Sequence, residues 1–167
     1  MTDSERASAT RPIPATRAEV FRVVSDARGH VAIDASGMLL SAPGNTPMAK
    51  VGDTFRLQMD RESLGDRPLG RYETLCTVTR IEADRLVEWN ITDGAQARPP
   101  FGHVFGYELS DNADGTTQVT SYCDWSGVPE GKKPPGAWPL IPVSSLRAGL
   151  GILERTLVNH VPLELFG

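Results

Sequence analysis

The sequence lacks several features that would each mark a particular class of protein. It contains two cysteines, Cys76 and Cys123, which lie far apart and outside any CxxC spacing, so neither a zinc site nor a disulfide framework is indicated. No apolar run approaches the roughly 20 residues of a membrane span. The net charge is −4 and lysine and arginine form no cluster, so the chain offers no basic face for nucleic acid or an anionic membrane.

The remaining composition is that of an ordinary globular protein, with 40% hydrophobic and 23% charged residues and no repeat or low-complexity segment. A length of 167 residues suits one domain with a substantial core. We expect a flexible tail over residues 1–7 and a single domain over residues 8–167. The N-terminal segment is polar and contains acids, unlike a signal or transit peptide, so a cytoplasmic location is expected.

Two short helices are predicted near the N-terminus, after a strand over residues 7–13. Thr16 and Glu19 match the capping box, in which two side chains satisfy free backbone N–H groups at a helix start. Gly29 is a stop signal for this first helix, and a second helix fits residues 30–35. The helical spacing of the first runs through Val20, Phe21, Val24 and Ala27.

Between residues 38 and 125 apolar and polar residues alternate, which is the pattern of β-strands. Ala83-Asp84 predicts a tight hairpin turn, Asp114-Gly115 is the clearest hairpin signal, and Pro99-Pro100 is a break. Because short turns cannot connect parallel strands, an antiparallel meander is predicted. The expected strands cover residues 38–41, 54–59, 72–81, 86–92, 101–109 and 116–125.

The C-terminal part is predicted to be an irregular loop followed by one long helix. Residues 127–142 contain five prolines and three glycines, which disfavour regular structure. A helix from Val143 to His160 follows, and Pro162 ends it. Its apolar residues form one stripe suited to packing on a sheet, made of Leu146, Leu150, Leu153, Leu157 and Val161.

The order of these elements resembles the helix-grip fold of the START-like (SRPBCC) superfamily, which includes the birch-pollen-allergen proteins and the polyketide cyclase/dehydrase family. The residues that carry the resemblance are the opening RPIPATRAEVFRVVSDARGHVAID, the VGDTF turn, the hairpins RIEADRLVEWNIT and GYELSDNADGTTQVTSYCDWS, and the closing LGILERTL. The chain is most similar to bacterial members of the cyclase/dehydrase type. The resemblance implies an α+β domain in which a curved antiparallel sheet of about seven strands wraps around the C-terminal helix and encloses a hydrophobic ligand.

Side-chain alternation then assigns the inward face of each strand. The Ala83-Asp84 hairpin pairs Val78 with Trp89, and both are apolar, so this parity defines the face that points toward the helix. The wall expected for the implied cavity is apolar and aromatic with a few polar tips. The predicted ligand-binding residues are Phe55, Leu57, Met59, Trp89, Phe105, Ser121, Trp125, Leu146, Leu150, Leu153 and Leu157.

The sequence contains no catalytic motif, metal-ligand spacing or nucleotide-binding fingerprint, so neither a metal nor a cofactor is expected. Three inward residues could transfer protons in an enzyme, namely His103, Tyr107 and Tyr72. We favour interpreting His103 as a core or cavity-lining histidine over a catalytic one, because a buried polar group needs a hydrogen bond or a wet cavity. His160 is interpreted as a cation near a helix C-terminus, and His30, at the corner between two helices, is assigned no role.

Three functions remain open at this point. The first is a binding or carrier module for a polyketide-like or lipid-like molecule. The second is a cyclase/dehydrase-type enzyme, whose cavity would orient a reactive chain. The third is an interaction protein of the chaperone-activator type, which shares the fold. The expected partner is a hydrophobic small molecule, with no nucleic acid and no membrane insertion, and a homodimer stays open.

Overall fold

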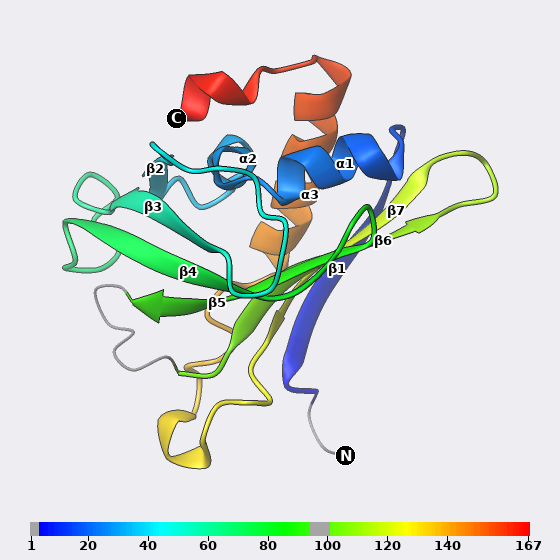
Figure 1. Cartoon of the computed structure of the whole chain (residues 1–167). Coiled ribbons are helices and arrows are strands. Elements are labelled where there is room, and N and C mark those ends of the chain that lie inside the picture. Colours follow the sequence, from blue (N-terminus) through cyan, green and yellow to red (C-terminus); the bar gives the residue numbers. More distant parts are fainter. Residues whose placement is uncertain (1–3, 94–100) are drawn as a thin grey trace.

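Seven strands form one curved antiparallel sheet in this computed structural model, which describes residues 4–93 and 101–167 (Figure 1). The spatial order is β1-β7-β6-β5-β4-β3-β2, which confirms the predicted antiparallel meander and adds the first strand beside the last. The predicted Pro99-Pro100 break, and residues 1–3 of the predicted tail, lie outside the described residues. The strands are β1 Arg6–Ile13, β2 Leu39–Ser41, β3 Thr54–Asp60, β4 Arg71–Glu82, β5 Leu86–Asp93, β6 Val104–Asp111 and β7 Thr117–Asp124.

Figure 1 shows the three α-helices on the same side of the sheet. The longest, α3, packs on β1 and β7 and also touches α1 and α2. Within residues 4–93 and 101–167, no helix combines the length and the apolar character that crossing a membrane requires. The helices are α1 Arg17–Val24, α2 Ala27–Ala32 and α3 Val143–Val158, with the short 3-10 helices η1 Glu130–Lys132 and η2 Leu163–Phe166.

The corner between α1 and α2 comes earlier in the chain than expected. The capping box of Thr16 and Glu19 is confirmed at the start of α1. The Asp26 side chain then accepts a backbone N–H and caps α2, so the second helix begins before Gly29 and not after it. Gly29 is therefore no stop signal. It allows the two helices to approach, because a Cβ at this position would lie 1.8 Å from the carbonyl oxygen of Val23.

The β4–β5 hairpin has the expected register although its turn is different. The predicted pairing of Val78 with Trp89 is confirmed. The turn contains three residues, 83–85, with Asp84 in the left-handed region at φ 59°. A three-residue turn alone would shift the pairing by one, but a bulge at Thr79 shifts it back. The inward parity of both strands survives because the two irregularities cancel.

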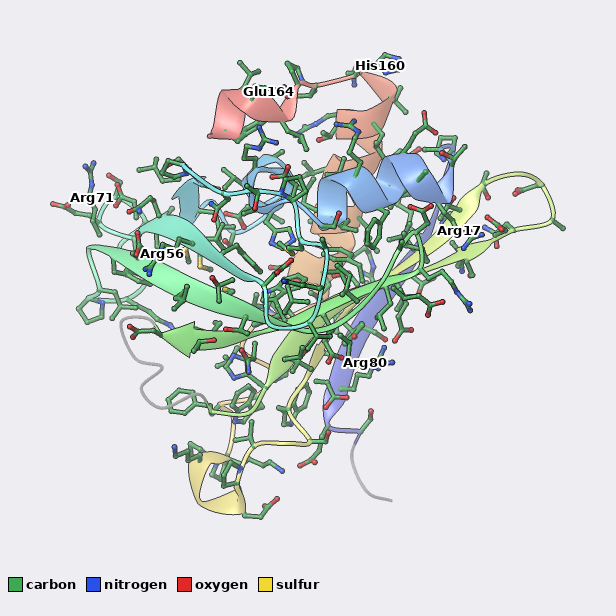
Figure 2. The ribbon with its side chains drawn as sticks, viewed as in Figure 1. Arg17, Arg56, Arg71, Arg80, His160 and Glu164 are labelled. Carbon is green, nitrogen blue, oxygen red and sulfur yellow. The ribbon has the colours of Figure 1, made fainter. Side chains whose placement is uncertain are left out.

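A polar cluster covers the face of the sheet that points away from the helices. The Tyr122 ring lies over Gly106, where a Cβ would come within 2.4 Å of it, and its hydroxyl donates to Glu88 at 2.7 Å. The Arg6 guanidinium lies 3.8 Å from the centre of the same ring. The Arg80 guanidinium is 3.7 Å from the Glu88 carboxylate, and Figure 2 shows Arg80 on this outer side. Glu88 is thus buried under a tyrosine.

Helix α3 ends in a Schellman motif centred on His160. The His160 N–H donates to the carbonyl oxygen of Leu157 at 3.1 Å, and the Val161 N–H donates to that of Thr156 at 3.0 Å. His160 itself adopts a left-handed conformation, with φ 50°. It therefore closes the helix through its backbone.

The two cysteines lie on strands that do not touch. Cys76 is on β4 and Cys123 on β7, with β5 and β6 between them. Both thiols are free and buried, and burial raises the pKa of each to about 12. They are small core residues.

Candidate functional site

A cavity of about 310 Å³ lies between the sheet and the N-terminal half of α3. Its wall is mostly apolar and aromatic, and strands β3 to β7 supply much of it. The alternation of the strands explains this, because the inward residues of neighbouring strands meet on the concave face. The predicted site residues that line the cavity are Leu57, Met59, Tyr72, Trp89, His103, Phe105, Tyr107, Ser121 and Leu146.

The other predicted residues lie outside the cavity wall, namely Phe55, Trp125, Leu150, Leu153 and Leu157. Leu150 and Leu153 are buried in the core because the rest of α3 packs on β1. Phe55 is one layer behind the wall, its ring edge-on to His30 at 5.3 Å between centroids. Trp125 stacks on Trp138 at 6.0 Å between ring centroids. The apolar stripe of α3 is thus divided between core and cavity.

His103 is buried in the cavity wall. The residue is 2% exposed, and neither ring nitrogen has a hydrogen-bond partner among residues 4–93 and 101–167. The rings of Phe101, Phe105 and Trp138 surround it at 5.1 to 6.3 Å between centroids. Burial lowers the pKa of His103 to about 4, so the imidazole is neutral at pH 7. It precedes β6, because the left-handed Gly102 (φ 96°) interrupts the extended chain expected from residue 101.

The two candidate tyrosines already have side-chain partners. The Tyr107 hydroxyl is hydrogen-bonded to Ser121, and burial raises the pKa of Tyr107 to about 12, so it is protonated at neutral pH. The Tyr72 hydroxyl accepts a hydrogen bond from Nε of Arg61 at 3.3 Å. The structure brings Tyr72, His103 and Tyr107 to one cavity but shows no hydrogen bond that joins them.

No protein-family model matches the chain. In sequence, the chain is 28% identical over 120 residues to the uncharacterized protein Rv0088 of Mycobacterium tuberculosis. This match covers 72% of the chain and 47% of that protein, so the chain spans about half the length of the curated relative that it matches.

Solved structures are similar over nearly the whole chain. A Rhodobacter sphaeroides protein has a TM-score of 0.63 at 13% identity, covering 95% of this chain and 96% of its own. Ginseng major latex-like protein 151 from Panax ginseng has a TM-score of 0.58 at 14% identity, covering 94% and 97%. DynU16, from the dynemicin biosynthetic locus, has a TM-score of 0.57 at 19% identity, covering 96% and 49%. The chain therefore has the helix-grip fold.

In this helix-grip domain, His30 is the cavity residue that sequence analysis left without a role. It lies on α2, where its Nε2 is 2.7 Å from the carbonyl oxygen of Val24. Its ring stacks on Trp89 with 4.5 Å between centroids. Burial lowers the pKa of His30 to about 4. No local pattern marks this position, because its neighbour Trp89 belongs to a strand far away in the sequence.

Loops complete the wall of the helix-grip cavity. The loop after β3 contributes Arg61, Arg67 and Leu69, and the segment before α3 contributes Leu140 and Ile141. Loops have no periodicity, so sequence reasoning could not assign these residues to the wall. Among residues 4–93 and 101–167, no three histidine, cysteine or acidic side chains come together closely enough to hold a metal ion.

Proposed function

We propose that this helix-grip domain is a binding or carrier protein for an apolar small molecule. The observation that carries the proposal is the cavity of about 310 Å³ with its mostly apolar and aromatic wall. Protein interiors pack about as densely as organic crystals, so an apolar space of this size suits a ligand. Small-molecule sites span roughly 300–1,000 Å³. A volume at the low end of that range favours a compact ligand over a long lipid chain.

The cyclase/dehydrase alternative has two observations in its favour. The fold is shared with DynU16, from a biosynthetic locus, and Tyr72, His103 and Tyr107 line the cavity. The protonation states of the last two argue against it. A general acid or base works best with a pKa near the operating pH, and burial moves the pKa of His103 to about 4 and that of Tyr107 to about 12. We therefore rank binding above catalysis.

Two glycines of α3 provide a matched test. Gly149 lines the cavity, and a Cβ there would meet only the carbonyl oxygen of Ile33, at 3.5 Å. Gly151 lies one half-turn on, outside the wall, and a Cβ there has no neighbour within 4 Å. Replacing either glycine by leucine raises helix propensity by a similar amount, about 0.5–1 kcal/mol. The two variants differ in where the new side chain lies.

We expect Gly149→Leu to fill part of the cavity and to weaken binding of the neutral dye N-phenyl-1-naphthylamine by about tenfold or more. Gly151→Leu should leave the dissociation constant within about twofold of wild type. Fluorescence titration measures both. Equal loss of binding in the two variants would place the dye elsewhere. A wild-type protein that binds no apolar dye would contradict the proposal and favour the interaction-protein alternative.

A further inference from the structure

His30 presents a hydrogen-bond acceptor of fixed identity to the cavity. A carbonyl oxygen can only accept, so the contact of 2.7 Å to Val24 requires a proton on Nε2. The low pKa, about 4, leaves the ring with one proton at neutral pH. Nδ1 therefore carries a lone pair. The Val24 carbonyl is one of the free groups at the end of α1, so helix geometry itself selects this tautomer.

The surroundings of His30 prevent the ring from turning away. Trp89 stacks on one side at 4.5 Å, and Phe55 meets the ring edge-on at 5.3 Å. Nδ1 has no hydrogen-bond partner among the described residues. Unlike the two nitrogens of His103, it is not sealed off by neighbouring atoms, and the ring forms part of the cavity wall. The lone pair of Nδ1 is therefore available to a ligand.

The cavity wall beside His30 is aromatic. The ring of Trp89 is stacked with that of Phe105 at 6.2 Å and with that of Tyr107 at 6.0 Å, with interplanar angles of 29° and 27°. A planar ring system packs well against such a surface. The ring of Tyr107 lies 6.4 Å from that of His30 between centroids, and the described residues show no hydrogen bond between the two side chains. The missing partner is a neutral donor carried by the ligand, since a cation would have to leave water for an apolar cavity.

We propose that the cavity binds a compact aromatic alcohol whose hydroxyl donates a hydrogen bond to Nδ1 of His30. This inference rests on the proposed binding function and names its ligand class. The ring system of the ligand packs on the wall formed by Trp89, Phe105 and Tyr107. The hydroxyl distinguishes among ligands of similar size. A ligand without a donor displaces water from Nδ1 of His30 and forms no hydrogen bond in its place, so it binds more weakly.

Three naphthalenes test the proposal, because they differ in one group. 2-Naphthol has a donor, 2-methoxynaphthalene has the oxygen without the donor, and naphthalene has neither. We expect wild type to bind 2-naphthol about threefold to tenfold more tightly than 2-methoxynaphthalene, the range expected for one hydrogen bond. Isothermal titration calorimetry gives the three dissociation constants. Failure of naphthalene and both derivatives to bind would contradict the proposed function. Equal binding of the three would contradict only the role of the hydroxyl.

Two histidine variants locate the effect. His30→Phe keeps an aromatic ring against Trp89 and removes the acceptor, so the preference for 2-naphthol should vanish. His103→Phe is the matched control, a buried cavity histidine with sealed nitrogens, and should keep the preference. His30→Gln, which offers both an amide donor for Val24 and a carbonyl acceptor, should restore part of it. Loss of the preference in His103→Phe alone would overturn the assignment to His30.

A measurement on wild type avoids any effect of mutation on folding. With ¹⁵N-labelled histidine, the Nδ1 resonance of His30 reports on the hydrogen bond that it accepts. Addition of 2-naphthol should move this resonance toward the position of a hydrogen-bonded nitrogen, and 2-methoxynaphthalene should leave it in place. An unchanged resonance with bound 2-naphthol would exclude the contact.

Discussion

His160 has a left-handed backbone conformation, φ 50°, at the end of α3. A side chain in this region suffers a steric penalty that glycine avoids, and glycine is the usual residue at this position of a Schellman motif. We expect His160→Gly to raise the free energy of unfolding by about 0.5–1 kcal/mol. Urea denaturation measures the change.

His160→Ala is the control for this prediction. Alanine removes the imidazole but keeps the Cβ, and therefore keeps the penalty. It should give no gain in stability. An equal gain from alanine and glycine would show that the imidazole, and not the backbone, is unfavourable at this position.

At the scale of elements, the outer faces of β5, β6 and β7 are held together by Tyr122. Its ring occupies the space above Gly106, and any Cβ there would come within 2.4 Å of the ring. We expect Gly106→Ala to lower the free energy of unfolding by about 1–3 kcal/mol, as overpacking does, because the ring must move and weaken its bond to Glu88. Chemical denaturation measures the loss.

A double-mutant cycle separates this effect from a change in strand propensity. In the Tyr122→Val background the ring is absent, so the added methyl group of Gly106→Ala should be nearly neutral. The same loss in both backgrounds would mean that the ring is not the cause.

The same scale shows how far local pattern determines structure. The capping box of α1, the strands and the Asp114-Gly115 hairpin could be predicted, because each depends on neighbours in the sequence. The burial of Glu88 could not, because the tyrosine that covers it comes from a strand two positions away in the sheet. The prediction that Gly29 is a helix stop signal was wrong for a similar reason, since the close approach of two helices depends on their packing.

For the molecule as a whole, two buried neutral histidines predict a loss of stability in mild acid. The pKa values of His30 and His103 fall from 6.5 in an unfolded chain to about 4, so the folded state binds fewer protons than the unfolded state between these values. The free energy of unfolding is therefore unaffected by their titration above pH 6.5 and decreases as the pH falls from 6.5 through 4. At about 1.4 kcal/mol for each pKa unit, each histidine accounts for a loss of up to about 3 kcal/mol in the free energy of unfolding between pH 6.5 and pH 4.

Urea denaturation at a series of pH values between 7 and 4 checks this expectation. The free energy of unfolding should fall with pH over this range, and His103→Phe should fall less steeply than wild type. That variant also removes a buried polar group without a partner, so it should be no less stable at pH 7. A stability independent of pH over this range would show that neither ring is held neutral by burial.

The site, like the fold, could be predicted where it depends on local sequence pattern and not where it depends on tertiary packing. The strand residues of the cavity, such as Trp89 and Phe105, follow from side-chain parity. The expectation that the whole stripe of α3 lines the cavity was wrong, because a helical stripe shows which face is buried and not what lies opposite each turn. Leu146 meets the cavity, whereas Leu153 meets the core. The place of His30 in the site could not be predicted, because it depends on the packing of α2 against Trp89 of β5.

The pairing of β1 with β7 has a consequence for synthesis on the ribosome. Arg6 pairs with Asp124, so more than a hundred residues must be synthesised after β1 before β7 can pair with it. An exposed strand edge during that delay can pair with another nascent chain. Arg6, Arg11 and Pro12 in β1 oppose this, since charge and proline both disfavour pairing with the wrong partner. The sequence of β1 thus suits a strand that must stay single until the rest of the sheet arrives.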